Sequence, residues 1–181
     1  MNSISPALKK RLKDIRLIIT DVDGVLTDGS FYIGKDTEIK RFHSKDGLAI
    51  VLLQLLEIPI AIISGRYSEA TLARTRALRI PDDLVFQNNH IKISSYKILK
   101  TRLQIKDHEI AYIGDDFIDE PVLRQCGVSF APANAISEIK AIVDYVTDAP
   151  GGSGALREMV DMILHAQNRM NEALKKLQGM Y

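Results

Sequence analysis

Short, continuous runs of apolar residues alternate along this chain with segments of helix-like periodicity. Apolar runs without polar interruption are typical of strands that are buried on both faces, and helices between them favour a parallel sheet. The sequence therefore predicts an α/β fold built on a doubly wound parallel sheet. Its predicted strands are residues 16–20, 59–63, 84–86, 110–113, 128–130 and 145–146. Its predicted helices are residues 46–56, with Asp46 as N-cap, 68–78, starting from Ser68, 91–103, 119–126, 136–141 and 155–167.

The size and charge of the chain exclude several classes of protein. A chain of 181 residues is the size of one domain, so we expect a single domain over residues 1–181. The net charge of +1 argues against a nucleic-acid partner, and the most apolar stretch, residues 49–63, is too short to span a membrane. Cys126 has no second cysteine to pair with, which favours a reducing compartment. We therefore expect a soluble, cytoplasmic protein without a signal peptide.

Two segments lie outside the strand and helix alternation. Residues 30–33 and 38–42 flank Gly34-Lys35-Asp36-Thr37, which predicts a β-hairpin inserted at about residues 30–42. The chain from about residue 168 is either a helical extension or a disordered tail. Neither segment is long enough to be a separate domain.

Polar side chains follow three of the predicted strands. Asp21 and Asp23 come directly after the first strand, Ser64 after the second, and Asp115 and Asp116 after the fourth. In a parallel sheet these positions meet at the carboxyl ends of the strands, where reactive residues collect. Two carboxylates two residues apart repel each other unless a cation or a proton intervenes. The pair is either two solvated turn aspartates or a metal-bound nucleophile beside an acid/base.

Other residues support the second interpretation. Ser64-Gly65-Arg66 offers a hydroxyl and backbone N–H groups that suit phosphate oxygens. Lys92 begins a helix, where a cation opposes the helix dipole, so that it is either solvated or paired with an anion. Asp115 and Asp116 supply the hard oxygen ligands that Mg²⁺ prefers.

Taken in order, DVDGVLTDG (residues 21–29), SGR (64–66), Lys92 and GDDFID (114–119) resemble the haloacid dehalogenase superfamily of aspartate-based phosphatases. The resemblance covers nearly the whole chain and implies a Rossmann-like fold. The hairpin, with no cap domain after it, and the segments FHSKDG, YIGDDFIDEPVL and GGSGALRE narrow the match. They resemble a capless branch, the 3-deoxy-D-manno-octulosonate 8-phosphate phosphatases. That family forms homotetramers in which a neighbour's hairpin or tail covers each active site.

The resemblance implies a role for each matching residue. Asp21 is similar to the nucleophile that becomes an aspartyl phosphate, and Asp23 to the acid/base that protonates the leaving oxygen and then activates water. Mg²⁺ would be held by Asp115, the Asp21 carboxylate and the Asp23 backbone carbonyl. Ser64 and Lys92 would bind the phosphoryl oxygens.

Asp116 would orient a metal-bound water. The small phosphorylated sugar acid would contact the positions that match the substrate-binding residues of the family. These are Asp23, His43, Ser44, Lys45, Asp46, Gly47, Arg66, Arg74 and Lys92.

Some matches leave alternatives open. Arg74 is either a substrate contact or part of a solvated arginine face, and His43 is either a contact or an ordinary hairpin residue. The chain has Lys45 where the family usually has arginine, Val51 where a cation is usual, and Asn88 where glycine is common. These departures leave the sugar open between the eight-carbon octulosonate and a nine-carbon keto-deoxy acid.

Two other classes of function are weaker. A receiver module that keeps phosphate on aspartate as a signal uses similar residues, but Asp23 beside Asp21 would hasten hydrolysis, which suits turnover. A binding-only protein is disfavoured because every chemical position is present. The leading hypothesis is a Mg²⁺-dependent phosphomonoesterase of lipopolysaccharide sugar biosynthesis.

Overall fold

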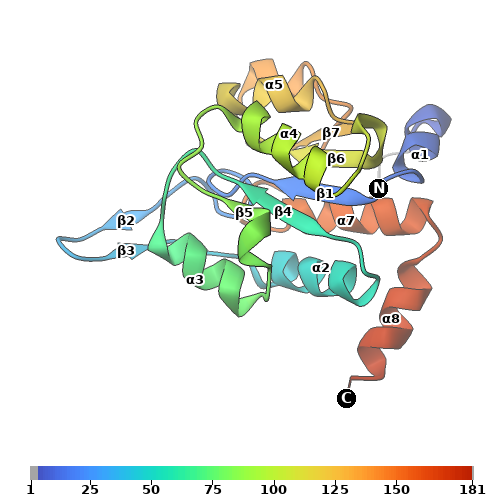
Figure 1. The fold of residues 1–181 in the computed structure, drawn as a ribbon, viewed down its shortest axis with the longest axis horizontal. Helices are drawn as coiled ribbons and strands as arrows, with labels where there is room; N and C mark the ends of the chain where they lie inside the picture. The colour runs from blue at the N-terminus through green and yellow to red at the C-terminus, as the bar shows by residue number, and fades with distance from the viewer. Residues whose placement is uncertain (1–3, 181) are drawn as a thin grey trace.

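The structure of the protein is a computed structural model that describes residues 4–180. Six parallel strands form its central sheet (Figure 1). Their order across the sheet is β5-β4-β1-β6-β7-β8, and every neighbouring pair is parallel. The strands are β1 (Leu17–Thr20), β4 (Ile60–Ile63), β5 (Val85–Phe86), β6 (Ile110–Ile113), β7 (Val128–Ala131) and β8 (Tyr145–Val146). The expected doubly wound α/β fold is confirmed, with all six predicted strands present.

Helices cover both faces of this sheet. Helices α4 and α5 lie on one face, and α2, α3 and α7 on the other (Figure 1). All residues of β1, β4, β6 and β7 are buried, which explains why these strands read as continuous apolar runs. The helices are α1 (Pro6–Leu12), α2 (Ser44–Leu55), α3 (Glu69–Ala77), α4 (Lys92–Arg102), α5 (Glu120–Leu123), α6 (Ser137–Lys140), α7 (Ala155–Ala166) and α8 (Met170–Gln178). Short 3₁₀ turns are η1 (Asp82–Leu84), η2 (Asp107–Glu109) and η3 (Phe117–Asp119).

Two predicted details of the helices differ from the structure. The N-cap of α2 is His43, whose Nδ1 accepts from the Lys45 amide at 3.2 Å, so the prediction of Asp46 as the cap is wrong. The helix predicted from residue 119 is divided into η3 and α5. The predicted cap of α3 is confirmed, because the Ser68 hydroxyl accepts from the Thr71 amide. The chain after residue 168 forms α8 as a helical extension.

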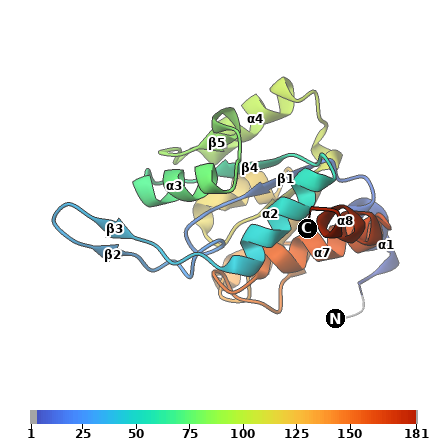
Figure 2. The ribbon, with the colours of Figure 1, turned by 90° about the horizontal axis from the view of Figure 1, so that it is seen from below.

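A two-stranded hairpin extends away from the sheet (Figure 2). It consists of β2 (Tyr32–Ile33) and β3 (Glu38–Ile39), paired antiparallel as predicted. Within the described residues 4–180, no helix is long and apolar enough to cross a membrane.

A glycine loop before α7 packs against the loop that follows β1. The Gly151 amide donates to Asn134 Oδ1 at 2.7 Å, and the Gly152 amide donates to the Val25 carbonyl at 2.9 Å. A Cβ atom on Gly151 would lie 1.8 Å from the Gly24 carbonyl oxygen, so only glycine fits there. The C-terminal part of the chain thereby supports the loop that carries Asp21 and Asp23.

Candidate active site

The polar residues at the carboxyl ends of β1, β4 and β6 line one cleft of about 260 Å³. Asp21 and Asp23 come from β1, Ser64 from β4, and Asp115 and Asp116 from β6. The cleft therefore brings together side chains that are up to 95 positions apart in the sequence, from Asp21 to Asp116. The rest of the lining is Phe31, Gly65, Arg66, His90 and Ile118.

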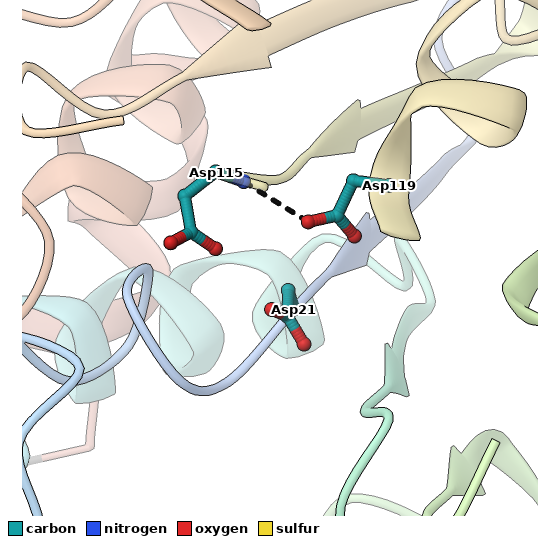
Figure 3. Close-up of side chains that lie close together, drawn as sticks. All are labelled: Asp21, Asp115 and Asp119. Atoms are coloured by element: carbon teal, nitrogen blue, oxygen red, sulfur yellow. Dashed lines mark hydrogen bonds between the residues drawn. The ribbon is translucent and has the colours of Figure 1, made fainter. Parts of the chain in front are cut away.

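Three carboxylates converge beside this cleft (Figure 3). Asp21, Asp115 and Asp119 each present an oxygen, and these atoms lie within 4.8 Å of one another. Burial, followed by the charge of Asp119, raises the pKa of Asp21 to about 7. Burial, followed by the charges of Asp21 and Asp119, raises the pKa of Asp115 to about 8. Without a cation, the cluster therefore resists carrying its full negative charge at neutral pH.

Asp119 organises this cluster from a fully buried position. Its Oδ2 accepts from the amide of Asp115 at 3.0 Å (Figure 3) and from the amide of Asp116 at 3.2 Å. Its Oδ1 accepts from Lys92 and from the Tyr112 hydroxyl. Both oxygens are thus already engaged, whereas Asp115 Oδ1 is buried without a hydrogen-bond partner among the described residues. Sequence reasoning gave Asp119 no role, although it is the last acid of the GDDFID motif.

Lys92 lies beneath the acidic cluster with its side chain fully buried. Its Nζ is 2.9 Å from Asp21 Oδ1 and 2.6 Å from Asp119 Oδ1. Burial disfavours the ammonium, but the two carboxylates outweigh it and raise the pKa of Lys92. The interpretation of Lys92 as a solvated helix residue is therefore wrong, and the expected anionic partner includes Asp21 and Asp119.

The Asp23 carboxylate is bound by Lys40, the residue after β3. Lys40 Nζ lies 2.7 Å from Asp23 Oδ1 and donates to Oδ2 at 2.8 Å, with its own side chain fully buried. Sequence reasoning missed Lys40, because a lysine in a short hairpin strand is ordinarily exposed to solvent.

Ser64 and Arg66 lie together after β4. The Ser64 hydroxyl donates to the Arg66 carbonyl at 3.1 Å, and the Ser64 side chain is almost completely buried at the cleft. The Arg66 guanidinium is paired with Glu38 and stacks 4.2 Å from the centre of the Phe31 ring. Arg66 is thus held at the cleft by two residues of the hairpin region.

The remaining predicted contacts lie outside this cleft. His43, Asp46, Gly47 and Arg74 surround a small, separate pocket under Phe42, and Ser44 is the first residue of α2. Lys45 lines a third groove together with Arg157. The Asp46 side chain is buried, and its Oδ1 accepts from the Arg157 amide at 2.9 Å. Arg74 is half-buried, with its guanidinium 5.7 Å from the Phe42 ring centre, so it is not part of a fully solvated face.

Comparison with known proteins places this geometry in a family. A model of haloacid dehalogenase-like hydrolases matches residues 82–158. The 3-deoxy-D-manno-octulosonate 8-phosphate phosphatase KdsC of Haemophilus influenzae is 40% identical over 163 residues, which are 90% of this chain and 89% of that protein. The chain belongs to this family of haloacid dehalogenase-like hydrolases. It is an enzyme, a phosphatase.

Two solved structures of such phosphatases match the fold of this chain. The structure from Yersinia pestis is 40% identical with a TM-score of 0.89, and the match covers 92% of this chain and 89% of that chain. The structure from Moraxella catarrhalis is 34% identical with a TM-score of 0.89, and the match covers 94% and 98%. The latter is a complex with a magnesium ion, a phosphate ion and a KDO molecule.

The backbone at Asn88 bears on the departure that the resemblance led us to expect there. Asn88, expected at a position where glycine is common, adopts a left-handed conformation with φ of 57°. Asparagine is among the few residues that tolerate this region, so the loop before Lys92 keeps its course without glycine.

The acidic cluster of the phosphatase fits a divalent cation. Among the described residues, Asp115 Oδ1 is buried without a hydrogen-bond partner. The pKa of Asp21 is raised by burial and by the charge of Asp119, and the pKa of Asp115 by burial and by the charges of Asp21 and Asp119. A hard cation is bound by carboxylate oxygens and removes that repulsion. Because Asp119 is already engaged on both oxygens, Asp21 and Asp115 are the carboxylates left to hold it.

Proposed function

We propose that this phosphatase is a Mg²⁺-dependent phosphomonoesterase that releases phosphate from 3-deoxy-D-manno-octulosonate 8-phosphate, in lipopolysaccharide sugar biosynthesis. The observation that carries the proposal is the contact of Lys92 with Asp21 at the floor of the strand-end cleft, beside Asp23 and Asp115. The proposed substrate is supported by the substrate in the names of the relatives and by the KDO molecule in the Moraxella catarrhalis structure.

The chemistry proposed for the cleft is covalent phosphoryl transfer. A carboxylate oxygen of Asp21 attacks phosphorus and forms the acyl phosphate, while the bond from phosphorus to the sugar oxygen breaks. Asp23 gives its proton to the leaving oxygen and is left as a carboxylate. Asp23 then takes a proton from a water molecule, whose oxygen attacks phosphorus. The bond between phosphorus and Asp21 breaks, and inorganic phosphate leaves.

Other residues of the cleft position the phosphoryl group. Lys92 and the hydroxyl and backbone of Ser64 are proposed to bind its oxygens, where fixed donors stabilise the charge of the transition state. Asp21, Asp115 and the Asp23 carbonyl would hold Mg²⁺, which supplies positive charge between nucleophile and phosphate when bound. Asp116, which lines the cleft beside Asp115, is proposed to orient a water there.

Recognition of the sugar acid is proposed to begin with Arg66. Its guanidinium is already at the cleft, and arginine suits bidentate capture of a carboxylate. His43, Ser44, Lys45, Gly47 and Arg74 stay predicted substrate contacts, together with the buried Asp46. His43, Asp46, Gly47 and Arg74 line one pocket apart from the cleft, and Lys45 lines another.

The proposal is tested by phosphate release from a panel of sugar phosphates with Mg²⁺. We expect selective turnover of the 8-phosphate of the octulosonate over the 9-phosphates of nine-carbon keto-deoxy acids. Selective turnover of a 9-phosphate would move the substrate to the nine-carbon class and keep the mechanism. A phosphorylated Asp21 that persists without product release would favour the receiver module instead.

We also propose that the phosphatase forms a homotetramer in which a neighbour covers the cleft. The hairpin exposes three large apolar or aromatic side chains, Tyr32 at 72%, Ile33 at 69% and Ile39 at 61%. A cluster of such exposed side chains is unusual on the surface of a monomer. Replacing Tyr32 and Ile33 with lysine is expected to dissociate the assembly, as sedimentation would show. Lys35→Met, at the exposed turn of the same hairpin, is the matched control. A fully active wild-type monomer would contradict the proposal.

The extent of the domain and the location of the protein remain proposals as well. We propose that residues 1–181 act as a single domain without a cap, because the described helices pack around one sheet and the inserted hairpin is short. We propose a cytoplasmic location, in keeping with one unpaired cysteine and the sugar phosphate substrate.

A further inference from the structure

The ion pair between the buried Lys40 side chain and the partly exposed Asp23 carboxylate joins the hairpin to the first motif and has no role in the mechanism described so far. Lys40 follows β3 directly, and its side chain passes from the hairpin into the protein, where its Nζ contacts both oxygens of Asp23 at 2.7 and 2.8 Å. A second contact, at 3.4 Å, joins Nζ to the Thr71 hydroxyl in α3. Lys40 thus links three parts of the chain: the hairpin, helix α3 and the loop after β1.

The surroundings leave Asp23 as the main partner of the Lys40 ammonium. Glu38 is 3.9 Å away from Nζ, but its oxygens are engaged by Arg66 and by the Ser68 hydroxyl at 2.5 Å. The Phe31 ring lies 5.9 Å from Nζ and helps to separate it from solvent. A buried lysine is costly unless a carboxylate pairs with it, so this contact constrains the lysine and the carboxylate together.

We infer that Lys40 is a positioning residue that fixes the Asp23 carboxylate for both of its proton transfers. Lys40 Nζ contacts both oxygens of Asp23, and Asp23 lines the cleft, so the action of Lys40 is assigned to Asp23 and not to the substrate. The inference rests on the proposed function, in which Asp23 is the acid/base. It also makes the hairpin a part of the catalytic machinery, in addition to any role as an interface.

The test compares Lys40→Met with wild type on two substrates. A sugar phosphate needs a proton on its leaving oxygen, whereas p-nitrophenyl phosphate releases a stable anion and does not. With the sugar phosphate we expect turnover to fall about 100-fold or more, since acid–base catalysis commonly contributes that much. With p-nitrophenyl phosphate the first step continues while hydrolysis of the acyl phosphate is slow. We therefore expect a burst of nitrophenolate, approaching one per active site and larger than in wild type.

Three controls separate positioning from a structural role. Lys40→Gln keeps a hydrogen-bond donor at this position, and it replaces Lys40→Met in the test if Lys40→Met does not fold. Lys35→Met changes an exposed lysine of the same hairpin and is expected to keep wild-type kinetics. Adding Lys40→Met to Asp23→Asn is expected to cause little further loss, because both changes remove the same function.

The inference is wrong if Lys40→Met keeps turnover within about threefold of wild type, far short of the roughly 100-fold that acid–base catalysis contributes. It is also wrong if turnover of both substrates falls equally and no burst is seen. A third contrary result is a loss of turnover in the double variant that equals the product of the losses in the two single variants. Failure of the proposed function looks different. In that case the wild type itself would release no phosphate, or Asp21→Asn would remain active.

Discussion

Replacing Asp21 with asparagine is expected to lower phosphate release by at least about a thousandfold, because the amide cannot attack phosphorus and no acyl phosphate forms. The fold should survive this change. Asp21 is buried, its pKa is raised to about 7, and Lys92 keeps its second partner, Asp119, at 2.6 Å. Asparagine removes the repulsion from Asp119 and Asp115, so we expect the metal-free variant to melt no earlier than wild type at pH 8.

Two measurements check this prediction. Acid-quenched wild-type enzyme with substrate should contain a fraction heavier by one phosphoryl group on the peptide with Asp21, and Asp21→Asn should contain none. Asp82→Asn changes an exposed carboxylate in η1 and should leave the rate unchanged. Retained activity in Asp21→Asn would mean that water attacks phosphorus directly. Loss of activity together with an early melting transition would mean that Asp21 is a structural residue.

The arrangement of the sheet and the place of the cleft could be predicted from short segments. Four continuous apolar runs predict strands buried on both faces, and these strands form the centre of the parallel sheet: β1, β4, β6 and β7. The carboxyl ends of parallel strands lie at the same edge of the sheet. The positions of Asp21, Ser64 and Asp115 then follow from the strand ends alone. No knowledge of a single side-chain contact was needed for this part.

The contacts inside the site could not be predicted in the same way. Lys40 and Asp23 are 17 positions apart, and they meet only because of the direction in which the hairpin leaves the loop after β1. Lys92 and Asp119 meet through the packing of α4 against α5. Such pairs depend on how helices, strands and hairpins pack against one another. The sequence shows which residues are charged but not which of them will pair.

The error at Asp46 has a related cause. Both His43 and Asp46 can accept a hydrogen bond at the start of α2, and aspartate is ordinarily the better cap. In the structure Asp46 Oδ1 instead accepts from the amide of Arg157, which lies 111 positions later in the first turn of α7. A side chain that local rules assign to its own helix is therefore used by a distant one.

Removal of the metal is the second large effect that we expect. Chelation with EDTA should reduce phosphate release at least about 100-fold, since the cation supplies several kcal/mol of charge stabilisation. Added Mg²⁺ should restore the rate. At about 100 times its dissociation constant it should stabilise the fold by about 2.7 kcal/mol, which raises the melting temperature by about 5–10 °C.

This stabilisation should grow with pH, and the sign follows from the raised pKa values of Asp21, about 7, and Asp115, about 8. A carboxyl group whose pKa in the folded protein exceeds its unfolded value of 3.8 stabilises the fold fully at pH values below 3.8. This stabilisation is lost as the pH rises through the pKa of the folded protein. The metal-free protein is thus weakened most near pH 8, where both groups ionise. At pH 5.5 Mg²⁺ must displace protons, so the increase in melting temperature should be smaller there.

Asp115→Asn distinguishes this account from a general effect of salt. The variant loses one carboxylate of the site, so its melting temperature should respond little to Mg²⁺ at either pH, while Asp82→Asn should respond like wild type. Because removing Asp115 also removes a charge that raises cluster repulsion, the metal-free variant should be as stable as wild type at pH 8 or more so. An increase in melting temperature that is equal at both pH values, or equal in both variants, would place Mg²⁺ away from Asp21 and Asp115. A stable variant that no longer responds to Mg²⁺ would show that these two carboxylates repel each other without the ion and hold it when it binds.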